Sequence, residues 1–279
     1  MDKRFKWNLE NMSANQKKIA DFIEKNGTRI VTLTEQDMAS ELQISIASVS
    51  RFWKAAGFKN LKDYKLSIIH ENGDISPANK IQNLLNKVGA DDLPGDMIDL
   101  SIQYLKETSA HLSREDFNLA VQALNRSRHI HIFAPGPSEA LGDLLQFRLT
   151  RFGYAATTTP KSGRELFEAL AHLHKEDTVV IFGFVRMLAE TEILLRHAKE
   201  TGYTTILITD QLVSDMNALA DIVLYSFRGQ MWEFHSMVAP MALVESLVVA
   251  AGMHNKEATL KQLEHFIALR KQYSSYIPN

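Results

Sequence analysis

The 279-residue sequence contains no cysteine, which excludes disulfide bonds and thiolate metal sites and is compatible with a reducing compartment. It also lacks any run of roughly 20 apolar residues, the length that a membrane-spanning helix needs. Its first residues, MDKRFKWNLENMS, lack the apolar core of a signal peptide. We therefore expect a cytoplasmic protein. Hydrophobic residues make up 45% of the chain, which is enough for a sizeable core.

A strong net charge is also missing, because the chain as a whole carries only −2. The balance hides a difference between its two parts. Residues 1–70 contain 12 Lys and Arg against 8 Asp and Glu, whereas residues 71–279 contain 19 against 25. A basic N-terminal part and an acidic remainder favour a nucleic-acid partner for the N-terminal part alone.

Acidic residues are absent from residues 45–60. This gap overlaps residues 34–58, TEQDMASELQISIASVSRFWKAAGF, which we interpret as two short helices joined by a turn at Gln43 and Ile44. Thr34 is a good N-cap, with Asp37 placed to complete a capping box. Ser45 caps the second helix, residues 46–56, which ends at Gly57.

The second helix has two different faces. Its apolar side is predicted to contain Ile46, Val49, Phe52, Trp53 and Ala56. The opposite side is small, hydroxylated and cationic, as a recognition helix in a major groove requires. The alternative is an ordinary amphipathic helix pair with a solvated face. The candidate DNA-binding residues are Thr34, Ser45, Ala47, Ser48, Ser50, Arg51, Lys54 and Lys59.

The flanking segments complete a small helical domain. Ser13 and Gln16 predict the start of a first helix that ends at Asn26 and Gly27. Apolar residues after Gly57, among them Leu61, Tyr64 and Leu66, are expected to close the core. Nearby, Lys59, Lys62 and Lys65 are either phosphate contacts or solvated side chains.

A linker is predicted where the composition changes from basic to acidic, at Asn72, Gly73, Asp74 and Pro77. We therefore divide the chain into residues 1–76, a DNA-binding domain; residues 77–127, a helical linker region with a break at 93–95; and residues 128–279, an α/β domain. Ser113 is predicted to cap the last linker helix.

Strands and helices alternate after residue 128, which predicts a five-stranded parallel sheet covered on both faces, a three-layer α/β domain. The expected strands are residues 129–134, 154–158, 178–184, 204–209 and 221–227. The expected helices are residues 138–152, 164–172, 188–201, 235–252 and 256–271.

Three loops at the carboxyl ends of these strands are candidate ligand sites, since open parallel sheets bind ligands there. In the first, Gly136 and Ser138 precede a helix whose N-terminus can hold an anion, or they form a plain strand-to-helix turn. The second contains Gly183 and Arg186, and Arg186 either grips phosphate or carboxylate with two parallel hydrogen bonds or makes a salt bridge. In the third, the candidates Thr209, Asp210 and Ser214 bind sugar or phosphate, or cap a short helix.

Over nearly its whole length the chain resembles the RpiR family of bacterial transcription regulators. The matching residues are Ala39, Leu42, Ile44, Ser45, Ser48, Val49, Ser50, Arg51, Phe52, Gly57 and Phe58 in the first domain, and Gly136, Ser138, Gly153, Lys175, Glu176, Asp177, Ile208, Thr209, Asp210, Ser214, Ala220 and Asp221 in the second. The resemblance implies an all-helical helix-turn-helix domain followed by a SIS (sugar isomerase) domain that binds phosphosugars.

The chain departs from the family pattern at three places. Gln43 replaces the usual turn glycine, and Ala134 stands where the first SIS loop often has glycine. The usual S-x-S-G-x-T phosphate loop is here Gly183-Phe184-Val185-Arg186-Met187-Leu188, so both serines and the threonine are missing. Arg186 is expected to replace the lost hydroxyl groups.

Other chemistry is sparse. None of the 10 histidines pairs with a carboxylate at metal-ligand spacing, so we expect no metal, no cofactor and no catalytic residue. Glu245 on an apolar helix face is either an acid–base residue or a satisfied interface residue.

Three functions remain open. The first is a regulator, expected to be a repressor of carbohydrate genes, that senses a phosphosugar or sugar acid and forms a dimer or tetramer through residues 240–249. The helices in residues 78–127 would transmit the signal. The alternatives are a sugar-phosphate isomerase or lyase with an added DNA-binding head, and a constitutive DNA-binding protein whose SIS domain only dimerises.

Overall fold

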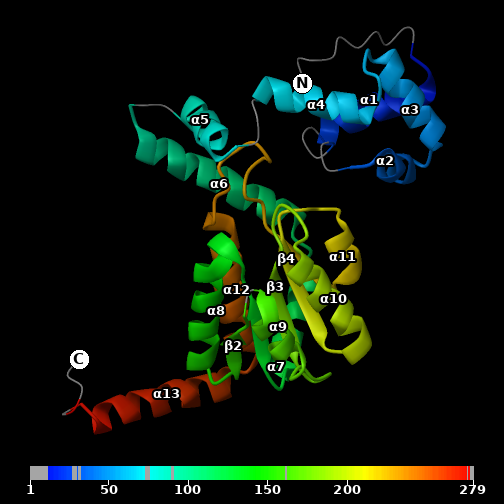
Figure 1. The fold of residues 1–279 in the computed structure, drawn as a ribbon. Helices are drawn as coiled ribbons and strands as arrows, with labels where there is room; N and C mark the ends of the chain where they lie inside the picture. Colours follow the sequence, from blue (N-terminus) through cyan, green and yellow to red (C-terminus); the bar gives the residue numbers. More distant parts are fainter. Residues whose placement is uncertain are drawn as a thin grey trace. The chain divides into compact units, whose positions relative to one another are not determined.

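The computed structural model describes residues 12–26, 30, 33–72, 76–88, 91–160, 162–274 and 276. The chain forms two compact units, and each is described separately (Figure 1). The first unit comprises Met1–Asp91 together with Gln230–Phe234, and the second comprises Asp92–Gly229 and His235–Asn279. The expected helix end at Gly27 and the expected linker residues Gly73 and Asp74 lie outside the described residues.

The first unit is helical, as predicted. Its described α-helices are α1 (Ala14–Asn26), α2 (Glu35–Leu42), α3 (Ile46–Ala55), α4 (Leu61–Asn72) and α5 (Pro77–Lys87). Side chains from α1 to α4 share one hydrophobic cluster, in which Trp53 stacks on Tyr64 with 4.8 Å between the ring centroids. Leu66 was expected in this core but is exposed, because α4 turns Leu61 and Tyr64 inward and Leu66 lies off that stripe.

The predicted helix caps are confirmed. The Thr34 hydroxyl accepts a hydrogen bond from the Asp37 amide at 3.1 Å, and the Thr34 amide donates to the Asp37 carboxylate at 2.7 Å. The Ser45 hydroxyl caps α3 by accepting from the Ser48 amide. Gln43, in the turn between α2 and α3, has a left-handed backbone with φ of 53°. This conformation explains why glycine is the usual residue there in the family that the sequence resembles.

The break in the helical region lies earlier than predicted. Leu93, Pro94 and Gly95 were expected to interrupt the helix, but they form the first turn of α6 (Leu93–His111). Asp92 caps this helix by accepting from the Gly95 amide at 3.1 Å. Proline is tolerated because the first amides of a helix have no partner within it. The next helix, α7 (Arg114–Arg126), begins after Ser113, whose hydroxyl caps it as predicted.

The second unit contains the predicted parallel sheet. Its strands are β1 (Ile130–Phe133), β2 (Ala156–Thr158), β3 (Thr178–Phe182), β4 (Thr204–Thr209) and β5 (Ile222–Tyr225), in the order β2-β1-β3-β4-β5. All neighbouring pairs are parallel. The chain leaves β1 for β2 on one side and then crosses to β3 on the other. The loops after β1 and β3 therefore flank the point where the strand order reverses.

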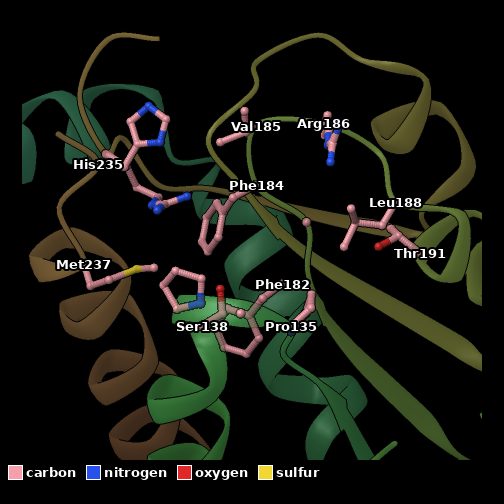
Figure 2. A pocket seen from close by; sticks show the side chains of 14 residues that line it. Pro135, Ser138, Phe182, Phe184, Val185, Arg186, Leu188, Thr191, His235 and Met237 are labelled. Atoms are coloured by element: carbon pink, nitrogen blue, oxygen red, sulfur yellow. The ribbon is translucent and has the colours of Figure 1, made fainter. Parts of the chain in front are cut away.

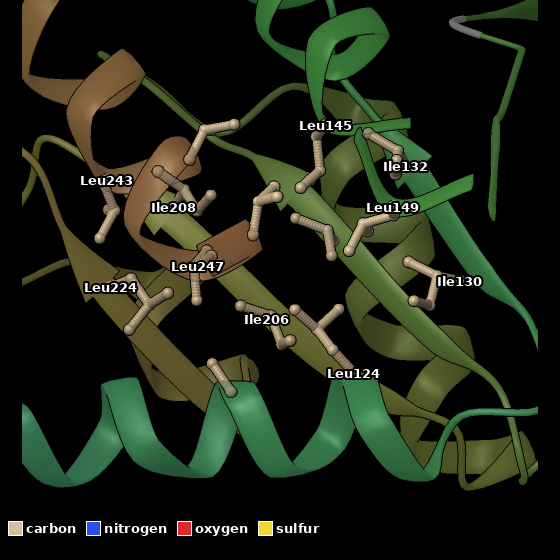
Figure 3. Packing of buried hydrophobic residues seen from close by; sticks show 14 of the residues in the cluster. Leu124, Ile130, Ile132, Leu145, Leu149, Ile206, Ile208, Leu224, Leu243 and Leu247 are labelled. Carbon is tan, nitrogen blue, oxygen red and sulfur yellow. The ribbon is translucent and has the colours of Figure 1, made fainter. Parts of the chain in front are cut away.

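Helices cover both faces of the sheet, giving three layers. One face packs against α7, α8 (Glu139–Arg151) and α12 (Val238–His254), and Figure 3 shows Leu124, Leu145 and Leu247 meeting the strands. The other face packs against α9 (Gly163–Leu170), α10 (Ala189–Thr201) and α11 (Asp215–Leu219). The β4 residues Ile206 and Ile208 point to the first face and Leu207 to the second, as the alternation of strand side chains requires.

The edge of the sheet opposite these loops is held by a buried carboxylate. Asp177, just before β3, accepts from Arg128 Nε and Nη2 at 2.9 Å each, and from the His174 amide at 2.9 Å. Burial raises the pKa of Asp177, but these hydrogen bonds outweigh burial, so the net shift is downward. This bidentate pair joins the start of β1 to the start of β3.

The last helix, α13 (Lys256–Gln272), follows α12 at an angle of 102° and extends away from the sheet (Figure 1). In the part of the chain that the structure describes, no single helix has the length and apolar composition to cross a membrane. The bent pair α12 and α13 meets that criterion by length and composition only.

Candidate functional site

Helix α3 presents the face that the sequence predicted for DNA. Val49, Phe52 and Trp53 are buried, whereas Arg51 and Lys54 are exposed. Ile46 was expected on the buried side, but 43% of its surface is exposed. Ile46 is the first residue of α3, so no preceding helical turn covers it. The periodicity of the sequence does not take this end effect into account.

All four candidate hydroxyl groups have partners within the unit, and the Ser45 and Ser48 hydroxyls lie 2.9 Å apart. The Ser50 hydroxyl donates to Glu35 of α2, and the other Glu35 oxygen accepts from the Leu61 amide at 3.3 Å. The Thr34 hydroxyl donates to Asp37 at 2.6 Å as part of its cap. The Ser50–Glu35 contact therefore helps to hold α2, α3 and α4 together, and Thr34 stabilises the start of α2. By contrast, Ala47, Arg51 and Lys54 are exposed.

The lysines after α3 divide into two kinds. Lys59 and Lys62 are exposed. Lys65 is neither a free phosphate contact nor a solvated side chain, because its ammonium donates to the Leu33 carbonyl at 2.6 Å. Burial lowers the pKa of Lys65, and the Asp37 carboxylate opposes that shift. Lys65 thus joins α4 to the segment just before α2. We no longer count it among the candidate phosphate contacts.

A pocket of about 300 Å³ lies where the strand order of the sheet reverses (Figure 2). Segments that follow β1, β3 and β5 contribute its lining, together with the start of α10. The lining residues are Pro135, Gly136, Pro137, Ser138, Phe182, Gly183, Phe184, Val185, Arg186, Leu188, Thr191, Arg228, His235 and Met237. The position agrees with the expectation that ligands bind beyond the carboxyl ends of the strands.

One wall of the pocket is the turn between β1 and α8. Gly136 has φ of 60°, and a Cβ atom there would meet nothing within 4 Å, so backbone conformation selects glycine at this position. Ser138 is buried, and its hydroxyl oxygen points into the pocket in Figure 2. The first amides of α8 follow directly. Together they provide a hydroxyl group and the positive end of a helix, which suits an anion.

The opposite wall is the loop after β3, and its backbone is strained. Val185 has φ of 66°, a left-handed conformation that is a genuine outlier for a β-branched residue. The Arg186 amide donates to the Phe184 carbonyl at 2.7 Å across this residue. Asp210 stabilises the turn by accepting from the Val185 amide at 2.8 Å. Backbone strain of this kind is concentrated at ligand sites.

The buried positive group at the pocket is one that sequence reasoning missed. Arg228 follows β5 and lines the pocket, yet only 5% of its surface is exposed. Its Nη1 lies 3.4 Å from Asp210 Oδ2, and its Nε has no hydrogen-bond partner in the described part of the chain. Burial lowers the pKa of Arg228 and Asp210 opposes the shift, but an arginine remains charged in proteins. A buried cation with a spare donor is suited to an anionic ligand.

The structure brings together four of the seven ligand candidates: Gly136, Ser138, Gly183 and Arg186. Arg186 is exposed at the rim. Asp210 positions the Val185 turn and Arg228. Thr209 and Ser214 do not line the pocket: the Thr209 hydroxyl accepts from the Gln211 amide at 3.2 Å, and Ser214 caps α11. Arg228 could have been found by the rule that singled out Arg186, since both directly follow an expected apolar strand.

The remaining polar candidates have structural partners. Arg148 lies 3.2 Å from Glu245, and both side chains are partly exposed. Among the described residues, no group of three or more His, Cys, Asp or Glu side chains could hold a metal ion. The pocket combines the two arginine side chains Arg186 and Arg228 with apolar and aromatic walls.

Comparison with known proteins agrees with this two-part architecture. Residues 1–73 match the family described as "Helix-turn-helix domain, rpiR family", and residues 123–250 match the SIS domain family. A helix-turn-helix-type transcriptional regulator of Haemophilus influenzae is 26% identical over 229 residues, which are 79% of this chain and 77% of that protein.

Two solved structures have a similar fold. The sugar isomerase domain of an RpiR transcription factor from Sphaerobacter thermophilus matches with a TM-score of 0.60 and 27% identity, over 63% of this chain and 99% of that one. The Vibrio vulnificus NanR protein, complexed with ManNAc-6P, matches over 98% of this chain and 97% of its own, with a TM-score of 0.62 and 18% identity. At that identity the second likeness concerns the fold.

Proposed function

The chain belongs to the RpiR family of transcription regulators, with a helix-turn-helix domain and a SIS domain, and we propose that it represses genes of carbohydrate metabolism in response to an anionic sugar derivative. In this proposal residues 1–76 bind DNA, residues 77–127 link the parts, and residues 128–279 bind the effector. Because the proposed partner is a DNA operator, the protein is proposed to act in the cytoplasm.

The observation that supports an anionic effector is the burial of Arg228 at the pocket wall, with its Nε left without a partner among the described residues. Ser138, the Gly136 turn and the start of α8 complete the anion site. Arg186 at the rim adds a second positive charge. A phosphosugar or a sugar acid fits this arrangement, and the NanR structure with ManNAc-6P makes a phosphosugar the first choice.

The outer face of α3 supports the DNA function. Arg51 is proposed to read a base edge, and Lys54 and Lys59 to contact phosphates, since all three are exposed on the basic part of the chain. The small side chain of Ala47 lets the helix approach the groove. Thr34, Ser45, Ser48 and Ser50 complete the proposed contact set.

The test is operator selection followed by effector titration. DNA bound by the pure protein is recovered from a random pool, and the selected site is titrated by fluorescence anisotropy with ManNAc-6P, with unphosphorylated ManNAc and with inorganic phosphate. Weaker operator binding with ManNAc-6P alone supports a phosphosugar-responsive repressor. Failure to select any sequence, or a selected site whose binding none of a panel of phosphosugars and sugar acids alters, contradicts it.

Two copies of the chain are proposed to bind an inverted repeat, because a single head offers few cationic contacts. The exposed apolar residues Phe147 on α8 and Val249 and Met253 on α12 are proposed to take part in self-association. Of the predicted segment 240–249, half of the residues are buried in the core of the unit, and Val249 is exposed. Analytical ultracentrifugation distinguishes dimers from tetramers, and a monomer at micromolar concentration with and without DNA would contradict the proposal.

An isomerase or lyase remains a second candidate because His235 lines the pocket, and histidine is the commonest general acid–base group. Against it, the Haemophilus influenzae relative is a transcriptional regulator, and Glu245 is paired with Arg148. Turnover of a sugar phosphate by the pure protein, abolished by His235→Gln, would favour the enzyme.

A further inference from the structure

One loop belongs to both units of the chain. It follows β5 and is closed at its base by the Ser236 amide, which donates to the Arg228 carbonyl at 2.9 Å. Arg228, His235 and Met237 at this base line the pocket. Gly229 has φ of 104°, which lets the chain leave the base directly after Arg228. The base of the loop is thus part of the proposed effector site.

The tip of the loop, Gln230–Phe234, belongs to the unit that contains α1 to α5. It is a compact turn of its own. The Glu233 amide donates to the Gln230 carbonyl at 2.9 Å, and the Gln230 amide donates to the Glu233 carboxylate at 2.9 Å. Two reciprocal hydrogen bonds therefore join the two ends of the tip.

Specific contacts attach this tip to the first unit. Asn83 of α5 donates to the Trp232 carbonyl at 2.9 Å, and Lys87 of α5 donates to the Glu233 carboxylate at 2.9 Å. Glu233 is 9% exposed, so its charge is largely removed from water. Met231 and Trp232 pack against the hydrophobic cluster that contains Val49 and Trp53 of α3. The same cluster holds the proposed recognition helix in place.

We propose that the loop from Arg228 to Ser236 transmits the state of the pocket to the DNA-binding unit. The inference rests on the proposed function for the identity of its ligand. Only Gly229 separates Arg228 from Gln230, and only Phe234 separates Glu233 from His235. An anion that draws the Arg228 guanidinium toward the pocket must therefore change the base from which the tip extends. Coupling then arises because the ligand favours one arrangement of the loop.

The experiment is a double-mutant cycle on the coupling itself. Full-length Lys87→Met, Glu233→Gln and the double variant are compared with wild type, with ManNAc-6P as the probe. The probe's dissociation constant is measured on the free protein and on its operator complex, and the ratio of the two is the coupling factor. Couplings of this kind are typically about 5- to 150-fold.

The expected result is separation of binding from response. All three variants should bind the probe as free proteins within about twofold of wild type, while the coupling factor falls toward one and the two single losses are not additive. The matched control is the exposed ion pair Glu192–Arg196 on α10, as Glu192→Gln and Arg196→Met, which should keep the full coupling. Variants at Lys87 and Glu233 that respond like wild type would overturn the inference.

A second readout separates this inference from the proposed function. If no probe binds the wild-type protein, the phosphosugar function fails, and the loop is tested by amide hydrogen exchange instead. Arg228→Met at the base should then increase exchange in α5, whereas Arg186→Met at the rim of the same pocket should not. Equal exchange in α5 for wild type and Arg228→Met would show that the base and the tip are independent.

Discussion

The guanidinium of Arg228 lies over the ring of Phe184, with 4.2 Å between Cζ and the ring centroid. Arg228 follows β5 and Phe184 follows β3, so this contact spans the strand between them at the carboxyl edge of the sheet. A cation over an aromatic face is stabilised by the ring quadrupole when water is excluded. The pair keeps the charge at the pocket wall while leaving Nε available to a ligand.

Arg228→Met should weaken binding of an anionic sugar such as ManNAc-6P by about 10- to 100-fold, because a charge-assisted hydrogen bond in a buried site contributes roughly 1.5–3 kcal/mol. Arg186→Met should weaken it less, and mainly at low salt, because exposed charges are screened. Isothermal titration calorimetry at two salt concentrations measures both. Thermal melting controls for folding, and a larger loss at Arg186 than at Arg228 would make the rim arginine the anchor.

On α3, Arg51→Ala should reduce affinity for a selected operator by about 1–3 kcal/mol while leaving binding to random DNA less affected. Lys54→Ala should weaken binding to both kinds of DNA and reduce the salt slope by about one. Lys175→Ala is the control, since Lys175 is an exposed lysine of the second unit, just before β3, and lies outside the helix-turn-helix domain. Gel shifts at several salt concentrations measure these affinities. Unchanged affinity in both α3 variants would show that α3 does not bind in the major groove.

The unfolding free energy of the second unit should fall as the pH drops below 6.5. Burial and the neighbouring His129 lower the pKa of His131 from its ordinary value of 6.5, with Asp177 opposing. The unfolded chain then binds more protons than the folded one below pH 6.5, so stability is lost there, by at most about 1.4 kcal/mol per pH unit for one proton.

The check is urea unfolding between pH 5 and pH 8 of wild type, His131→Gln and the exposed-site control His265→Gln. The first variant should flatten the dependence and the second should not. Asp177 does not contribute to the change between pH 5 and pH 8. Its pKa in the folded state is lowered below 3.8, so the stability that it contributes is lost only in stronger acid. A slope unchanged by His131→Gln would assign the pH dependence to another group.

Restoring the family's first loop serine by Gly183→Ser should destabilise the protein by about 1–3 kcal/mol through overpacking. A Cβ atom at residue 183 would lie 2.7 Å from Leu207 Cδ1 and 3.1 Å from Met216 Sδ. Leu207→Val removes that Cδ1 atom, so the double variant should lose less than the sum of the two single changes. Urea unfolding of all four proteins measures the interaction, and a neutral Gly183→Ser would contradict the packing explanation.

Self-association should be sensitive to charge at the exposed apolar surface of α8 and α12. Phe147 is 59% exposed and Met253 is 72% exposed, so Phe147→Glu and Met253→Glu should leave folding intact while shifting the proposed dimer toward monomer. Sedimentation velocity at micromolar concentration provides the measurement. The exposed Phe167→Glu on α9 serves as the control, and equal effects of all three would point to a non-specific loss of association.

Local sequence was enough for the strands, for the caps and for most of the helices, although it misplaced the break before α6. Thr34, Ser45 and Ser113 cap the helices that the sequence assigned to them, since a capping hydroxyl bonds amides only two or three residues away. Alternating strands and helices likewise predicted the five-stranded parallel sheet. Even the position of the pocket followed, because the carboxyl ends of parallel strands meet at one edge.

What only the tertiary structure decided depends on contacts between distant residues. Arg228 became the central cation of the pocket because Asp210 and Phe184 surround it, and the sequence weighed only Arg186, which lies at the rim. Lys65 was expected to be a phosphate contact or a solvated side chain, but it bonds the Leu33 carbonyl, and the Ser50 hydroxyl has Glu35 of α2 as a partner. Nothing in the local sequence of residues 230–234 indicated that they contact α5. Their place beside α5 follows from packing over some 150 positions of chain, which no periodicity of 2 or 3.6 residues encodes.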